Sequence, residues 1–598
     1  MVLFTLAAPI QASLVGSSFI HAPAVLSNQN KGTLTGISLN VTNGDGNVVV
    51  IGPQYVNIST TSSAQTAATY AASYLNLNES DYNFTYTIID AGGNVTGPSG
   101  GLAFTLLAIS ALSNRPLTSN FTVTGTIDSN GDVGQVGGVY DKAGIAAQNG
   151  MRFIIVPSTY GSAFEATLYE IIHSTFGITI TEVSNVSQAL PYAFGTETAS
   201  NFVYNTYTGY DTSMLPAANL SCTECNSSAF AKLASFTFNL TQAEVNSIIG
   251  SEYATTRAGM QESLAQDKKI ASAGYLYTAA DMAYLTYLDA YTIASSGTVT
   301  TVSGARELIN STQSYCNNLS APQLTSSNYE YVIGGQVRQA WADSSLIQAM
   351  AYLNQSDITT DGILNAVYMT SSAQGWCSAS AEMYSIASSI GGTPTHVSQS
   401  LQSTAQEYMR LASSAGNNTY YLSAVSSYNS KNYAASLYSS VYAMSLYSTT
   451  PEYSMQKQKN FTIQNINKSG FGDWPYQLAL ESRFYLNEAA LNSTSAQEYT
   501  STAYSTSVLA YNLANATRII SAALVNNSMQ NTTQSAGANT SEISGLYGRI
   551  NSEYIDIELL AAAVVVEFFI IMLLLSASMR RKNQHAKRAR TRRHSRRS

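Results

Sequence analysis

The residue pattern of this chain changes near residue 200, and this change constrains the fold more than any other feature. Up to about residue 195, short apolar or β-branched runs alternate with helical patterns. From about residue 230 onward strand patterns disappear, and long segments of Ala, Ser, Tyr and Leu carry apolar residues at three- and four-residue spacing. At 598 residues the chain is too long for one core. We therefore predict an α/β (α+β) domain over 17–195, a connector over 196–230 and an all-α domain over 231–554.

Local signals place the individual elements. In the first region, the expected strands are residues 36–41, 48–51, 84–89, 121–127 and 153–156, and the expected helices are residues 63–75, 99–113, 142–149 and 163–174. Pro116 follows the second of these helices and Gly150 the third, as helix stop signals do. In the second region, we expect helices that include residues 273–294, 398–414, 431–447, 495–526 and 541–554.

Charge is scarce in the body of the chain and concentrated at its C-terminal end. Charged residues make up 11% of the chain, against roughly a quarter in an ordinary soluble domain. After Met579 come ten Lys or Arg and no acid, and without these ten the chain has 18 basic and 36 acidic residues, a net charge of −18. This balance gives the body no basic face for nucleic acid, so no nucleic-acid partner is expected.

A long apolar segment precedes the basic tail. Residues 559–579 have one charged residue, Glu567, and at 1.5 Å per residue they are long enough to cross a hydrocarbon core of about 30 Å. We predict one C-terminal transmembrane helix over 555–579 that contacts membrane lipid. The positive-inside rule makes 580–598 a basic cytoplasmic tail, which also touches anionic lipid. The protein is then expected in the cell membrane with a single pass, and with both folded domains outside the cytoplasm.

Three further features fit an extracytoplasmic body. Residues 1–16 are interpreted as a signal or leader remnant, although no basic residue precedes their apolar part. There are 21 Asn-x-Ser/Thr sequons between Asn40 and Asn539, which indicates a glycoprotein. An even number of cysteines suits one or two disulfides, drawn from Cys222, Cys225, Cys316 and Cys377. The CxxC has no second CxxC or paired histidines, so no metal site is expected.

Two residues of the first region have chemical potential. Ser99 stands in the turn Gly97-Pro98-Ser99-Gly100-Gly101, directly before an apolar helical pattern, where the amides of a helix start suit an oxyanion. By itself such a turn is more often a helix cap. Lys142 is one of two lysines in the first 200 residues and stands at a helix start, where a cation is electrostatically misplaced. It is either a solvated first-turn lysine or a buried general base with a lowered pKa.

Together these motifs resemble the proteolytic domain of Lon proteases, the S16 serine peptidases with a Ser–Lys dyad. The matching stretches are GPSGG at 97–101, TGT at 124–126, GDVGQVGGVYDK at 131–142, Gly150 and FIIVP at 153–157. The resemblance implies that Ser99 is the nucleophile, that Lys142 is its base, and that Thr124 lies near the lysine amine. Gly97, Pro98 and Gly100 then form the supporting oxyanion turn. The family pattern has acids where Thr96 and Thr126 stand, and a lysine where Tyr140 stands.

The resemblance leads to a functional prediction. No GxxxxGK[ST] motif of an ATPase occurs in the chain. We therefore expect a membrane-anchored, ATP-independent Lon-like serine endopeptidase, which cleaves unfolded or flexible extracytoplasmic proteins or peptides through an acyl-enzyme and needs no cofactor. One alternative is a surface scaffold or adhesion protein with a degenerate Lon-like domain. Another is a processing subunit whose helical domain recruits a partner. The sequence leaves open whether the protein forms a homo-oligomer.

Overall fold

The computed structural model describes residues 13–26, 31–52, 56–89, 97–159, 163–200, 215–218, 220–223, 225–355, 358–416, 418–447, 453–493 and 495–526. The chain divides into two compact units. The first consists of Met1–Thr159, Phe164–Tyr204 and Leu353–Leu364, and the second contains the remainder. The first unit thus takes a short segment from the middle of the helical half of the sequence. The expected membrane span 559–579 and the helix 541–554 lie outside the described residues, and none of the described helices has the length and apolar character to cross a membrane.

The first unit contains two main sheets. The larger has the strand order β1-β2-β4-β3, in which only the β3–β4 pairing is parallel; its strands are β1 (Leu14–Leu26), β2 (Lys31–Asn43), β3 (Val48–Ile51) and β4 (Tyr82–Ile89). The smaller is parallel and has the order β5-β8-β9, with β5 (Phe121–Val123), β8 (Phe153–Pro157) and β9 (Thr179–Val183). A short hairpin joins β6 (Thr126–Ile127) to β7 (Val133–Gly134).

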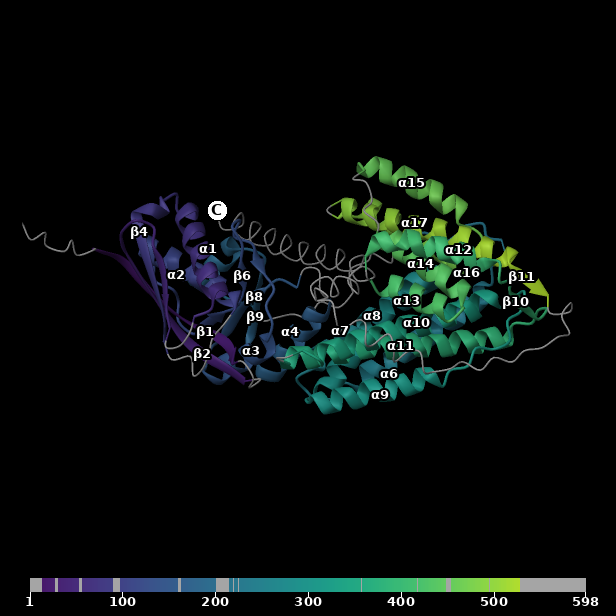
Figure 1. The fold of residues 1–598 in the computed structure, drawn as a ribbon, viewed down its shortest axis with the longest axis horizontal. Helices are drawn as coiled ribbons and strands as arrows, with labels where there is room; N and C mark the ends of the chain where they lie inside the picture. The colour runs from purple at the N-terminus through teal and green to yellow at the C-terminus, as the bar shows by residue number, and fades with distance from the viewer. Residues whose placement is uncertain are drawn as a thin grey trace, which may run out of the picture. The chain divides into compact units, whose positions relative to one another are not determined.

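Among the described residues of this unit, five α-helices accompany these strands, and Figure 1 shows α1 and α2 beside the strands of the larger sheet. They are α1 (Ile58–Tyr74), α2 (Gly101–Ser113), α3 (Val139–Gln148), α4 (Ala163–Phe176) and α5 (Val186–Ala193). Every residue of α2 from Gly101 to Ala111 is buried. Fully burying a leucine such as Leu106 or Leu107 contributes about 2 kcal/mol. Because α2 is fixed on all sides, the turn at its N-terminus, which holds Ser99, is held in place as well.

Several predicted elements of the first unit are confirmed, and others differ in an informative way. Strands were expected at 48–51, 84–89 and 153–156 and are found there as β3, β4 and β8. The strand expected at 121–127 is broken between β5 and β6, at Thr124 and Gly125. β1 begins at Leu14, so residues 14–16 of the expected leader lie in the sheet. β9 and α5 were missed.

The two helix ends that the sequence marked had different outcomes. The helix expected over 99–113 does end at Ser113, where Asn114 adopts a left-handed conformation with φ +51° and closes the last turn. The helix expected to begin at Lys142 begins three residues earlier at Val139, directly after Gly138, whose φ is +69°. Lys142 is therefore the fourth residue of α3 rather than the first.

The second unit is helical. Its helices are α6 (Ser227–Ser247), α7 (Ala254–Ser272), α8 (Leu276–Ser296), α9 (Val302–Asn317), α10 (Tyr329–Tyr352), most of α11 (Thr360–Ser389), α12 (Leu401–Ala412), α13 (Thr419–Asn429), α14 (Tyr433–Tyr447), α15 (Met455–Lys468), α16 (Asp473–Leu491) and α17 (Ala496–Ala522). The expectation that this half has no strands is wrong in one place, since β10 (Thr395–Val397) pairs antiparallel with β11 (Leu524–Asn526).

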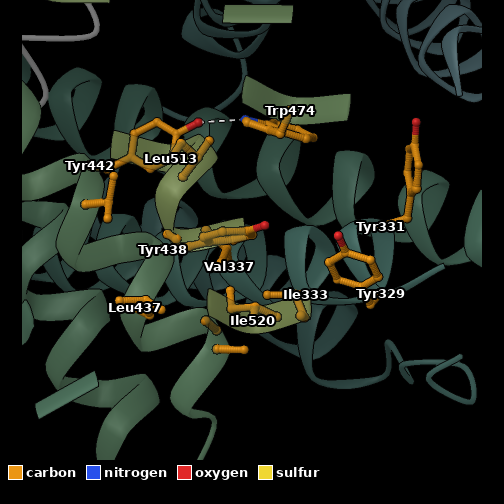
Figure 2. Packing of buried hydrophobic residues seen from close by; sticks show 14 of the residues in the cluster. Tyr329, Tyr331, Ile333, Val337, Leu437, Tyr438, Tyr442, Trp474, Leu513 and Ile520 are labelled. Carbon is orange, nitrogen blue, oxygen red and sulfur yellow. Dashed lines mark hydrogen bonds between the residues drawn. The ribbon is translucent and has the colours of Figure 1, made fainter. Parts of the chain in front are cut away.

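Tyrosine and tryptophan supply much of the helical core. Figure 2 shows Tyr438 and Tyr442 of α14 facing Val337 of α10 and Trp474 of α16. The Trp474 indole N–H donates to the Tyr442 hydroxyl at 2.7 Å. At this contact two large rings fill the core while their polar atoms bond to each other, so burying them leaves neither polar group unpaired.

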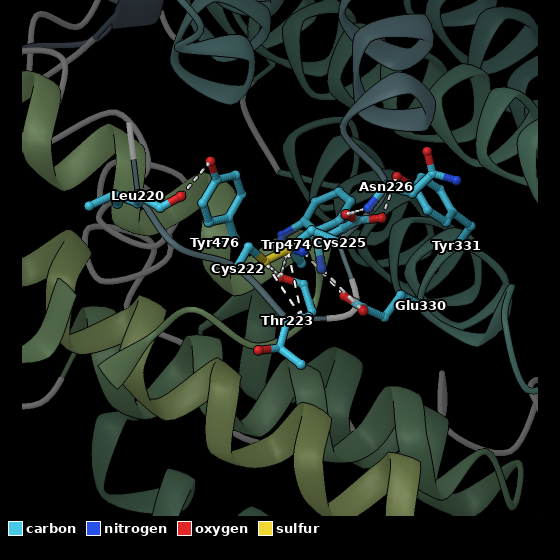
Figure 3. Close-up of a disulfide and its surroundings, with 11 residues drawn as sticks. Leu220, Cys222, Thr223, Cys225, Asn226, Glu330, Tyr331, Trp474 and Tyr476 are labelled. Carbon is cyan, nitrogen blue, oxygen red and sulfur yellow. Dashed lines mark hydrogen bonds between the residues drawn. A yellow bond between two sulfur atoms is a disulfide. The ribbon is translucent and has the colours of Figure 1, made fainter. Parts of the chain in front are cut away.

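All four cysteines form disulfides. Cys316 pairs with Cys377 and so joins α9 to α11. Cys222 pairs with Cys225 inside the region predicted as a connector (Figure 3). Between these two cysteines, Thr223 exchanges backbone hydrogen bonds with the loop that precedes α16, accepting from Gly472 N–H and donating to the Gly470 carbonyl, both at 3.1 Å. This part of the connector is thus bound to the helical unit.

Candidate active site

The Ser99 turn is built by glycine geometry and by α1. Gly97 has a φ of +108°, which favours glycine, and Pro98 begins a 3₁₀ turn, Pro98–Gly100, that leads into α2. Two hydroxyls of α1 hold this turn, because Thr60 Oγ1 donates to the Gly97 carbonyl and Ser63 Oγ donates to the Pro98 carbonyl, each at 3.2 Å. The turn therefore presents Ser99 at the N-terminus of a buried helix, where the helix dipole is positive.

The segment between β5 and β6 is hydrogen-bonded to the Ser99 turn and to the start of α2. Gly125 N–H donates to the Ser99 carbonyl at 3.0 Å, and Leu102 N–H donates to the Gly125 carbonyl at 3.1 Å. Thr124 Oγ1 also donates to the Ser99 carbonyl, at 3.4 Å. The amides of Gly101 and Leu102 are already bonded within the fold, which leaves the N–H groups of Ser99 and Gly100 as candidate oxyanion donors.

Lys142 lies against the same segment. Its side chain is buried, with 3% of its surface exposed, so the interpretation as a solvated first-turn lysine is wrong. The Nζ donates a hydrogen bond to Thr124 Oγ1 at 3.2 Å. A chain of contacts thus runs from the Lys142 amine through the Thr124 hydroxyl to the backbone of Ser99.

Burial changes the protonation of this lysine. Removal from water penalises the ammonium form and lowers the pKa of Lys142 from 10.5 to about 8, while the negative charge of Asp361 acts in the opposite direction. Half of the amines are neutral at a pH equal to that pKa, so an appreciable fraction can accept a proton near neutrality. Asp361 was not singled out from the sequence.

Ser99 and Lys142 line one cavity of about 350 Å³. Thr126 and Gln135 also border it, together with two glycines, Gly97 and Gly137. Much of the remaining wall is apolar and comes from β1, β2, β4 and α2, with the side chains of Ala22, Val25, Ile37, Ile88 and Phe104. The cavity can therefore take an uncharged or apolar side chain beside the two reactive groups.

The structure describes two of the three positions that depart from the family pattern. The ring of Tyr140 packs edge-on against Phe176 of α4, with ring centroids 4.9 Å apart. Thr126 lines the cavity, and Thr96 lies outside the described residues. His173, which the sequence suggested is packed rather than catalytic, contacts the Ile178 carbonyl through Nδ1 at 2.9 Å.

A serine at a helix start and a buried lysine that contacts the same turn are the residue types that Ser–Lys hydrolases use as nucleophile and base. Comparison with known proteins agrees. Residues 24–195 match the profile of the Lon protease (S16) C-terminal proteolytic domain, so the predicted resemblance is confirmed. A Lon-type proteolytic domain is thus followed by a helical region.

Individual relatives match shorter stretches. The archaeal Lon protease of Methanocaldococcus jannaschii is 34% identical over 100 residues, which are 17% of this chain and 14% of that protein. The Lon protease of Lawsonia intracellularis is 31% identical over 170 residues, 27% of this chain and 20% of the relative. That of Mycoplasma mycoides is 42% identical over 62 residues, 10% of this chain and 8% of the relative. The chain therefore spans no more than about a fifth of the length of these curated relatives.

Proposed function

We propose that this chain is a serine endopeptidase in which Ser99 attacks the peptide carbonyl and Lys142 is the general base. The observation that carries the proposal is the hydrogen-bonded path from the Lys142 amine through Thr124 to the Ser99 turn, beside a cavity of about 350 Å³. The match of residues 24–195 to a Lon proteolytic domain supports the same reaction.

In the proposed reaction, the neutral Lys142 amine takes the Ser99 hydroxyl proton while Oγ bonds to the scissile carbonyl carbon. Backbone N–H groups of the turn around Ser99 stabilise the oxyanion that forms. Lysine then protonates the leaving amine, the C–N bond breaks, and an ester to Ser99 remains. In the second half, the amine accepts a proton from water, hydroxide attacks the ester, and the Ser99 hydroxyl is restored. The chemistry needs no cofactor.

We further propose that the enzyme acts without ATP, at the outer face of a membrane. The apolar segment 559–579 and the ten cations after it support an anchored chain with a cytoplasmic tail. The lack of an ATPase motif in the sequence supports cleavage of substrates that need no unfolding: unfolded segments, flexible loops and peptides.

The test is cleavage of dye-labelled casein and of short peptides by the full chain in detergent, with and without Mg-ATP. The parent is compared with Ser99→Ala and Lys142→Ala. The matched controls are Ser62→Ala on α1 and Lys268→Ala on α7, which remove the same groups at exposed positions. We expect equal rates with and without ATP, full rates in both controls, and at least about a 10³-fold loss in both site variants.

Three results would change the proposal. Unchanged cleavage in Ser99→Ala and Lys142→Ala would refute the dyad. A rate that requires ATP would refute the ATP-independent part alone. A folded parent that cleaves neither casein nor peptides would favour the alternative of a surface scaffold with a degenerate proteolytic domain.

A further inference from the structure

The N-terminus of α3, the helix that carries Lys142, has no capping side chain of its own. Its N-cap residue is Gly138, which makes no side-chain hydrogen bond. A helix start leaves four backbone N–H groups without intrahelical partners, and burying them unpaired is costly. In this structure the acceptor comes from a distant part of the sequence. The carboxylate of Asp361 accepts from Val139 N–H at 2.6 Å and from Tyr140 N–H at 2.9 Å.

The arrangement is reciprocal. Asp361 belongs to the first turn of α11, and Asp141 belongs to the first turn of α3. The Asp141 carboxylate accepts from the Thr360 hydroxyl at 2.7 Å and from Thr360 N–H at 3.3 Å. Each helix therefore caps the start of the other with a carboxylate. Both caps lie inside the first unit, to which Leu353–Leu364 belongs.

The cap acts on Lys142 in two ways. It fixes the first turn of α3, and Lys142 is in that turn, one residue after Asp141. Its negative charge also acts on the buried amine, in opposition to the positive end of the helix dipole. Asp361 is itself buried, at 7% exposure, so little water screens this charge.

We propose that Asp361 is a positioning residue for the Ser99–Lys142 reaction, which holds the first turn of α3 and whose negative charge acts on the Lys142 amine. The proposal rests on the proposed function, because it concerns the same site. It also assigns a role in the reaction to a residue that lies far outside the matched stretch 24–195.

Described residues on two elements contribute charge at this pair. The charges of Asp141 on α3 and of Lys142 affect Asp361, and the charge of Asp361 affects Lys142. Burial raises the pKa of Tyr169 on α4, and the negative charge of Asp361 acts in the same direction. The Tyr169 hydroxyl donates to the Pro157 carbonyl at 3.0 Å. Burial raises the pKa of Asp361 to about 6, so the carboxylate is ionised over the range in which the amine, with a pKa of about 8, loses its proton.

The signs follow from these charges. An ionised Asp361 favours the ammonium form and holds the Lys142 pKa up, so loss of its charge lowers that pKa further. The proteolytic rate depends on the neutral amine, and its rise with pH should therefore move to lower pH in Asp361→Asn. Asparagine keeps one acceptor for the α3 amides, whereas Asp361→Ala keeps none.

The experiment uses the full chain. The pH dependence of casein cleavage is measured for the parent, Asp361→Asn and Asp361→Ala, and the Lys142 amine is titrated directly by NMR of ¹³Cε-labelled lysine, assigned with Lys142→Met. In Asp361→Asn we expect both midpoints to fall by about one pH unit. In Asp361→Ala we expect kcat to fall at least about tenfold at every pH, with KM changed much less.

The control is Asp473→Asn in the helical unit. Asp473 is also buried, at 4% exposure, and its carboxylate also accepts a hydrogen bond from a backbone N–H, that of Asn226. The substitution therefore removes a buried, hydrogen-bonded carboxylate from α16 and leaves the cap of α3 unchanged. It should leave both midpoints unchanged.

A folded Asp361→Asn in which neither midpoint moves would overturn the inference, even if it lowers stability. If Asp361→Ala does not fold, the Asn variant still decides. If the parent has no proteolytic activity, the proposed function fails, and the NMR titration alone tests the effect of Asp361 on Lys142.

Discussion

Replacing Lys142 by Met should make the protein inactive and more stable. Methionine keeps an unbranched side chain of similar length and removes the buried cation. The structure gives the magnitude. Burial lowers the pKa of Lys142 from 10.5 to about 8, and a difference of about 2.5 units corresponds to about 3 kcal/mol that the folded state loses when the amine is protonated. The lost hydrogen bond to Thr124 offsets about 1 kcal/mol of the gain. The net gain at pH 6.5 is about 2 kcal/mol.

The pH dependence gives this prediction its sign. The pKa of this base is lower in the folded state than in the unfolded state, so the cost is absent above about pH 10.5. It grows as the pH falls toward the folded pKa of about 8, and it is complete below that value. The advantage of Lys142→Met should therefore be largest at pH 6.5 and fall below about 1 kcal/mol at pH 9.5.

The assay must report on the first unit, because a chain with two units need not unfold in one step. Urea-dependent hydrogen exchange of peptides from α2 and β8, followed by mass spectrometry, does so. Lys268→Met, which changes an exposed lysine, is the control and should not shift the urea midpoint. A Lys142→Met variant that is no more stable than the parent at pH 6.5, or a difference that does not depend on pH, would show that Lys142 is not a strained buried cation.

Three further predictions concern the site and the helical core. Thr124→Val removes the hydroxyl that contacts Lys142 Nζ and the Ser99 carbonyl, so kcat should fall about 10- to 100-fold. Thr124→Ser keeps the hydroxyl and should keep most of the activity. Equal rates in the two variants would rule out a role for the hydroxyl. The kcat/KM of the parent should rise about tenfold per pH unit below the Lys142 pKa of about 8 and level off above it, and a midpoint near 6 would indicate a different base. Asp267 is 1% exposed, neither carboxylate oxygen has a hydrogen-bond partner among the described residues, and burial raises its pKa well above 3.8, so the cost of ionising it grows as the pH rises. Asp267→Leu should therefore raise the free energy of unfolding that α7 peptides report by about 1–3 kcal/mol, more at pH 8 than at pH 4, and a lower urea midpoint would contradict this.

The sequence was most informative where the site is local in the chain. The Ser99 turn depends on Gly97 and Pro98, and Lys142 follows a Gly-Gly turn, so neighbouring residues carry most of the geometry. Because charged residues are scarce in the body of the chain, Lys142 was conspicuous as one of two lysines in the first 200 residues. Pattern reasoning could also separate the two halves, because strand alternation and helical spacing differ over long stretches.

The features it missed depend on contacts between distant residues. The start of α3 could not be read from its own sequence, because the acceptor for its first amides, Asp361, is 222 residues from Val139. The pairing of β10 with β11 joins short segments about 130 residues apart, each too short to show a period.

The most direct test of the account is covalent trapping of Ser99. The full chain is incubated at pH 8.5 with a serine-acylating peptide probe, and the adduct is located by peptide mass spectrometry. We predict one adduct, on Ser99, which disappears in Ser99→Ala, is reduced at least about 10³-fold in Lys142→Met, and persists in Ser62→Ala. An adduct on another residue, or one on Ser99 that forms equally fast without the Lys142 amine, would contradict the assignment of this pair as nucleophile and base.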